Sequence, residues 1–285
     1  MAMVLVNVAL ILAAMLQVPA AHGHAAAVPR VSVAEPGGAS DQGPSERDRI
    51  ARASSLGAML YMFDRAAWVS SDALTAVVSR DRLAAIGGYV VENPDPDTLR
   101  VTYYRGKAAA AESVFVADVR AGKVVKSQLL ATPVMLTPAQ ALLARARDVA
   151  AETARSRGYA PCSPLPFNTV VLPPRADGGI AVYLLTPQQS AGSFPMGGHY
   201  RVLVGGNGQV LTSRPYSVGC LDTALPKLPT GATPIGLVVN SLLDPVPTEI
   251  HVFASYNLRM PVFVATRDKR LWKVAGSSIA LAPAK

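Results

Sequence analysis

Apolar residues dominate the first part of the chain and then give way to a polar, proline-rich stretch. Nearly every residue from 4 to 18 is Ala, Val, Leu, Ile or Met, and small residues follow at Ala20, Ala21 and Gly23. This pattern is typical of a secretory signal and its cleavage site, although no Lys or Arg precedes Arg30. We therefore expect residues 1–23 to be a signal peptide. A retained anchor is the alternative, but roughly fifteen apolar residues are short for a membrane span of about twenty.

The next residues show no apolar period. Gly, Pro, Ala and Ser are common over 24–46, which predicts a flexible linker. Ser45, followed by charged residues, predicts an N-cap for a helix over 49–64. A second helix is predicted over 73–86, capped at 71–72 and ended by a pair of glycines.

After residue 88 the pattern changes to that of short strands rich in β-branched and aromatic residues. These predicted strands run over 89–92, 99–105, 114–120 and 123–130. The connections between them are short, which predicts an antiparallel meander.

The clearest helical pattern in the chain begins at Thr137-Pro138. Thr is a good N-cap and Pro is favoured at the first helical position. Apolar residues recur on one face through 139–157, and Gly158 is the expected stop. The pattern predicts an amphipathic helix that lies on a sheet.

Strand patterns fill the rest of the chain. They fall at 169–172, 180–186, 199–204, 209–213, 235–243, 249–255, 261–266 and 270–274. We therefore predict an α+β fold of antiparallel β-meanders with a few packed helices. A weak sequence similarity among the predicted hairpins suggests two related helix-plus-meander halves, 47–133 and 134–285. The second half would end in a further meander. Hairpins also look alike simply because turns and alternation impose the same pattern.

Half of the residues are hydrophobic, which is ample for a core and excludes disorder except locally. The net charge of +8 favours anionic partners such as envelope polymers, anionic lipid or nucleic acid. Lys and Arg are nevertheless scattered singly, which argues against nucleic acid. The densest group is Arg267, Lys269 and Arg270, beside Trp272. We consider these residues binding candidates, although the ordinary interpretation is charges at a hairpin end, with both Trp272 and Trp68 in the core.

The chain has two cysteines, Cys162 and Cys220. In an exported protein such a pair is expected to form a disulfide. A bridge across 58 residues would stabilise the fold by about 4 kcal/mol in the loop-entropy model. A thiol nucleophile activated by His199, or a pair of metal ligands, are the alternatives.

The sequence contains no nucleotide-binding glycine pattern, no Gly-x-Ser-x-Gly and no His-Glu-x-x-His. On a predicted strand, Glu249 and His251 would point to one face, and His199 could join them in a zinc site. Local hydrogen bonds that satisfy each histidine are the alternative. We expect no cofactor.

These features favour an exported protein, periplasmic or secreted, with no membrane span once the signal is removed. We expect it to be a non-enzymatic binding or envelope-interaction protein, with an anionic envelope polymer or another exported protein as its partner. An exported hydrolase, perhaps metal-assisted through His199, Glu249 and His251, is the alternative. A lipid-facing envelope component is a third possibility.

Overall fold

The computed structural model describes residues 44–107, 110–225 and 235–283. The predicted signal peptide and nearly all of the predicted linker lie outside these residues. The described residues form four helices and several antiparallel sheets, so the α+β class is confirmed. Within them, no helix has both the length and the apolar character needed to cross a membrane.

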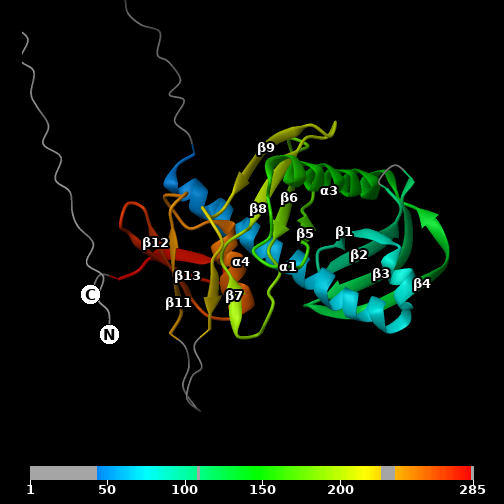
Figure 1. Cartoon of the computed structure of the whole chain (residues 1–285), viewed down its shortest axis with the longest axis horizontal. Helices are drawn as coiled ribbons and strands as arrows, with labels where there is room; N and C mark the ends of the chain where they lie inside the picture. Colours follow the sequence, from blue (N-terminus) through cyan, green and yellow to red (C-terminus); the bar gives the residue numbers. More distant parts are fainter. Residues whose placement is uncertain (1–43, 108–109, 226–234, 284–285) are drawn as a thin grey trace, which may run out of the picture. The chain divides into compact units, whose positions relative to one another are not determined.

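The longest element is helix α1 (Glu46–Val77), drawn from blue to cyan in Figure 1. The predicted cap is confirmed, because Ser45 and Asp48 form a capping box. The predicted break near residue 71 is wrong. The Ser71 hydroxyl donates to the carbonyl of Trp68 one turn earlier, so the helix continues through this residue and is not capped by it. A short helix, α2 (Arg80–Ala84), follows.

Sheet A follows the helices in simple order. Strands β1 (Ile86–Asp95), β2 (Thr98–Arg105), β3 (Glu112–Arg120) and β4 (Lys123–Met135) pair consecutively and antiparallel, as predicted. Apolar residues of α1 and of this sheet share one core that includes Phe63, Val101 and Phe115. At its centre the buried Tyr103 hydroxyl donates to the Ala67 carbonyl of α1 at 2.9 Å.

Helix α3 (Pro138–Arg157) forms as the sequence predicts. Thr137 and Gln140 form a capping box, and Gly158 ends the helix in the left-handed conformation. The helix packs on sheet B, in a second core that includes Leu143 and Val182.

Sheet B is antiparallel in the order β5 (Asn168–Val171), β6 (Ile180–Leu185), β8 (Tyr200–Val204) and β9 (Val210–Pro215). Between β6 and β8 lies β7 (Ser193–Pro195), which pairs with β10 (Asp222–Ala224) in a separate two-stranded sheet. A helix precedes each of these two sheets in the chain, while the division into two related halves and their origin by duplication stay predictions.

The C-terminal part differs from the predicted run of strands. Residues 249–255 are helical, in α4 (Glu249–Leu258). This helix connects β11 (Leu237–Ser241) to β12 (Val262–Thr266), which pair in parallel. Antiparallel strands β13 (Leu271–Ala275) and β14 (Ser278–Leu281) complete the sheet. The first seven residues of α4 are all buried. They therefore lack the exposed polar stripe that marks an amphipathic helix, and their pattern predicts a strand instead.

Helices α1 and α4 cross in close contact at a glycine. A Cβ atom on Gly57 would lie 2.4 Å from Val252 Cβ and 2.7 Å from the Glu249 carbonyl oxygen. Any side chain at this position would therefore push the two helices apart.

The first residue of α4 carries a buried carboxylate that joins this helix to sheet B. Oε1 of Glu249 accepts hydrogen bonds from Tyr183 at 2.9 Å, from Arg201 at 3.0 Å and from Tyr216. Burial raises the pKa of both tyrosines, which keeps the two phenols protonated as donors. The carboxylate also lies at a helix N-terminus, where negative charge is stabilised. We call these four residues the Glu249 cluster.

Replacing Glu249 with alanine should be strongly destabilising. The change leaves the largely buried Arg201 guanidinium and two phenols without their acceptor, which costs about 3–5 kcal/mol. Urea unfolding of Glu249→Ala measures this loss. The control is Glu152→Ala, which breaks the exposed Glu152–Arg155 pair and should cost less than about 1 kcal/mol. Equal losses in the two variants would contradict this role of the cluster.

Candidate functional site

A groove with a cavity volume of about 650 Å³ lies among α1, α4 and the segment that follows β6. Aromatic, amide and hydroxyl side chains share its wall with one carboxyl and one guanidinium. The lining residues are Asp64, Arg65, Trp68, Asn168, Leu185, Thr186, Pro187, Gln188, Gln189, Ser190, Ala191, Phe194, Pro195, His199, Phe253 and Asn257. A mixed apolar and polar lining of this kind is typical of small-ligand sites.

The carboxyl in the groove is Asp64, from the middle of α1. Its burial raises its pKa to about 7, and the neighbouring Arg65 only partly opposes this shift. No hydrogen bond from a described residue contributes to the shift, so the protein leaves this carboxyl unpaired. A carboxyl that titrates near neutral pH inside a cleft is a good candidate for a functional group.

Trp68 lies one turn further along α1 and also lines the groove. Its side chain is 57% exposed, so the prediction that it belongs to the core is wrong. The Arg65 guanidinium lies 4.5 Å from the ring centroid in a cation–π contact. The indole therefore offers a large apolar surface at the groove, held beside a positive charge.

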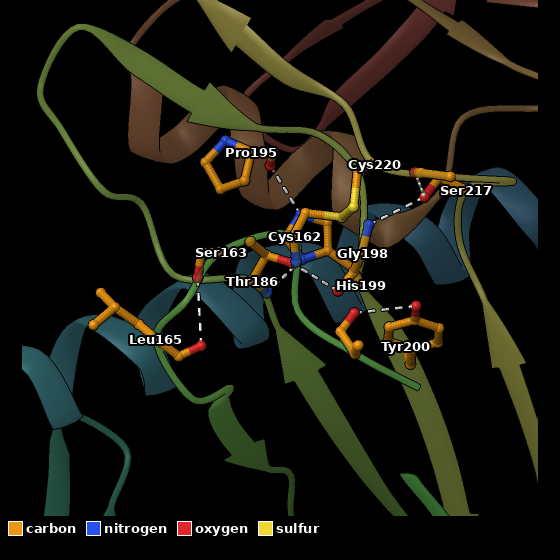
Figure 2. Close-up of a disulfide and its surroundings, with 12 residues drawn as sticks. Cys162, Ser163, Leu165, Thr186, Pro195, Gly198, His199, Tyr200, Ser217 and Cys220 are labelled. Carbon is orange, nitrogen blue, oxygen red and sulfur yellow. Dashed lines mark hydrogen bonds between the residues drawn. A yellow bond between two sulfur atoms is a disulfide. The ribbon is translucent and has the colours of Figure 1, made fainter. Parts of the chain in front are cut away.

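The opposite wall is fixed by a disulfide between Cys162 and Cys220, which confirms the predicted pairing (Figure 2). The Cys162 amide donates to the Thr186 hydroxyl at 3.0 Å, and that hydroxyl donates to the Gly198 carbonyl at 2.8 Å. Gly198 has a φ of +72°, and a Cβ atom there would lie 2.4 Å from Cys162 Sγ. Only glycine fits between the disulfide and the groove wall. The bond is compatible with an exported protein.

His199 is buried behind this wall with both ring nitrogens occupied. Nδ1 accepts a hydrogen bond from the Thr186 amide at 3.1 Å, and Nε2 donates to the Pro195 carbonyl at 2.8 Å. Burial lowers its pKa to about 4, so the ring is neutral near pH 7. His199 thus joins the residue that follows β6 to the last residue of β7 and has no free nitrogen with which to act as a base.

The predicted metal ligands do not assemble. Glu249 and His251 are two residues apart on a helix and so point to different sides. Glu249 accepts the donors of its own cluster, and His251 Nδ1 accepts from the Thr248 amide at 3.0 Å. In the part of the chain that the structure describes, no three His, Cys, Asp or Glu side chains are arranged to hold a metal ion. Local hydrogen bonds account for both histidines.

The charged hairpin proposed from the sequence lies at the β12–β13 turn. Arg267 and Lys269 are exposed there. Arg270 forms ion pairs with Glu46 and Asp268 and lies over the ring of Trp272, which is only 2% exposed. Trp272 therefore belongs to the core, and the charge of Arg270 is already balanced.

Sequence reasoning missed most of the groove. Its residues come from four separate segments, and their spacing along the chain does not reveal that they meet. One usable signal was Asp64, an isolated carboxylate in the apolar run from Leu60 to Trp68. An acidic residue in such a run is either exposed by the helix period or held in a special environment, and here the second applies.

Comparison of the chain with protein-family models, curated proteins and solved structures finds no match. The function is therefore argued from the geometry of the groove.

Removing both cysteines should destabilise the protein and loosen this wall. Loss of a bridge across 58 residues is expected to lower the free energy of unfolding by about 4 kcal/mol. Chemical denaturation of the Cys162→Ser, Cys220→Ser double variant measures the loss, and reduced wild-type protein is the matched control. An unchanged unfolding midpoint in both samples would contradict the assignment of a structural disulfide.

Replacing Asp64 with asparagine should stabilise the protein at pH 8 more than at pH 5. The folded-state pKa is about 7 and the ordinary value is 3.8, so the wild type loses stability as the pH rises between them. Asparagine does not titrate and avoids this loss. Arg65, Tyr89 and His199 are unchanged in the variant, so the difference between the two proteins isolates Asp64. A difference that is constant from pH 5 to 8 would show that Asp64 titrates normally.

Proposed function

We propose that this chain is an exported, periplasmic or secreted, non-enzymatic protein that binds a saccharide segment of an envelope polymer in the groove. The observation that carries the proposal is the exposed Trp68 ring beside the unpaired carboxyl of Asp64, within a groove that is also lined by several amides.

This lining matches the chemistry of an amino sugar. The apolar face of a sugar ring stacks on an aromatic side chain, and the exposed Trp68 supplies such a ring. Sugar hydroxyl and N-acetyl groups need partners that both donate and accept hydrogen bonds. Amide side chains do both. Four of them line the groove, from Asn168, Gln188, Gln189 and Asn257.

The carboxyl and imidazole groups that line the groove support binding without hydrolysis. Most enzymes that hydrolyse glycosidic bonds use two carboxyl groups. Asp64 is the one carboxyl among the described residues that line the groove. His199, the lining residue that could serve as a base, already uses both ring nitrogens.

Export is supported by the apolar start of the chain and by the disulfide. The net charge of +8 would in addition draw the protein toward anionic envelope polymers.

Tryptophan fluorescence can test the proposal, because the chain has two tryptophans and only Trp68 is exposed. The reporter is Trp272→Phe, a tolerable change because the buried Trp272 indole nitrogen has no hydrogen-bond partner among the described residues. Titration with the tetramer of N-acetylglucosamine should shift the Trp68 emission to shorter wavelength with saturation. Cellotetraose, which lacks the N-acetyl groups, should bind more weakly.

A matched variant locates the binding site. Calorimetric titration of Trp68→Ala should show at least a tenfold loss of affinity for the tetramer. Val125→Ala, a change at a similarly exposed residue outside the groove, should show none. Failure of the N-acetylglucosamine tetramer to bind, or equal affinity for it in both variants, would overturn the proposed function. Release of shorter sugars during the titration would overturn its non-enzymatic part.

A further inference from the structure

One end of sheet A is distorted in a way that regular strands do not require. Between Ser113 and Phe115, β3 advances two residues, while its partner β4 advances five, from Leu129 to Val134. The extra residues of β4 therefore bulge out of the ladder. Bulges of this size are retained where they re-aim side chains or open a site.

The neighbouring strand pairs are irregular at the same end. The β2–β3 register shifts between Tyr103 and Tyr104, and the β1–β2 register shifts between Ile86 and Gly88. All three pairs of sheet A thus break their ladders there. Two smaller shifts lie elsewhere in the sheet, between Glu92 and Asp95 and between Asp118 and Val119, so the feature that sets this end apart is the size of the β4 bulge.

The distorted end encloses a pocket with a cavity volume of about 170 Å³. Bulge residues of β4 form one side of it, and the chain between α1 and β1 forms another. Its apolar lining includes Val78, Ile86, Val114, Leu130, Ala131 and Pro133. The apolar surface continues outside the pocket, because Val134 and Met135 are each 56% exposed.

The charged residues that line the pocket, within the described chain, are two arginines. Arg105 is already paired, because Glu112 accepts from its Nε at 3.0 Å and from its Nη2 at 2.9 Å. Arg82 takes part in none of the ion pairs found among the described residues. The pocket therefore combines an apolar interior with one uncompensated positive charge.

We propose that this pocket binds a free single-chain fatty carboxylate, with the alkyl chain among the apolar residues and the carboxylate at Arg82. Each buried methylene contributes about 0.8 kcal/mol, and a guanidinium matches the charge and planar geometry of a carboxylate. The small volume favours one chain over a two-chain lipid. A partner β-strand is disfavoured, because the bulge interrupts the β4 edge and Pro133 has no N–H to donate.

Calorimetry with decanoate and 1-decanol separates the role of the carboxylate from that of the alkyl chain. Decanoate is used below its micelle-forming concentration and 1-decanol below its solubility limit. The wild-type chain should bind both, and decanoate more tightly. Arg82→Gln should weaken decanoate binding about tenfold and leave decanol binding unchanged. Equal loss for the two probes would show that Arg82 does not hold the carboxylate and would overturn that assignment.

A second pair of variants on β4 tests the pocket itself. Ala131→Phe fills it and should abolish binding of both probes. Val125→Phe places the same side chain on an exposed position of the same strand outside the pocket, and should change neither affinity. Because these β4 positions are exposed, thermal unfolding should report both variants as folded.

Two results would overturn the pocket as the binding site: decanoate binding that survives Ala131→Phe, or no binding of either probe by the wild type. Binding of the wild type to anionic phosphatidylglycerol vesicles is compared with its binding to decanoate. If the wild type binds these vesicles while decanoate fails to bind or to compete, the surface recognises a membrane and the proposal is wrong.

Discussion

The Glu249 carboxylate is the contact on which the position of α4 depends. It receives hydrogen bonds from Tyr183, Arg201 and Tyr216 of the sheet B region, while the same helical turn lies against Gly57 of α1. One turn of α4 is thus held between two parts of the protein. The helix then delivers Phe253 and Asn257 to the groove. Shape complementarity at Gly57 brings α1 and α4 together, and the cluster joins α4 to sheet B.

This cluster specifies the structure more than it stabilises it. Desolvation of Arg201 and Glu249 offsets much of their attraction, and an apolar replacement of the whole cluster would give similar stability. Directed hydrogen bonds, however, allow one arrangement of α4 and sheet B, whereas apolar contacts allow several. Asp64 differs from this cluster, because its burial lowers stability and no hydrogen bond among the described residues compensates for it. Its carboxyl is partly buried without a hydrogen-bonding partner among the described residues, which is unfavourable for folding and is the kind of cost that proteins accept where a ligand supplies the partner.

Local signals in the sequence predicted the elements whose ends and faces are set locally. Thr137 and Gly158 bound α3 because capping needs only nearby residues, and the β1–β4 meander follows from alternation and short turns. The two cysteines predicted their own bond. Helix α4 was predicted as a strand because its first seven residues are all buried, so it lacks the exposed polar stripe that marks an amphipathic helix. Trp68 was assigned to the core because the sequence does not show which face of α1 meets the sheet. The groove was missed because its walls meet only through tertiary packing.

Sheet A and sheet B contribute to different candidate sites. Sheet B and the disulfide form part of the groove, and the bulge of sheet A forms part of the apolar pocket. The most direct test of the central claim, that the groove is a ligand site, is hydrogen–deuterium exchange of the full chain with and without the N-acetylglucosamine tetramer. Binding in the groove should slow exchange in the loop over 186–191 and in the last turns of α4, with residues 123–135 of β4 unchanged. Protection confined to β4, or none at saturating tetramer, would contradict it.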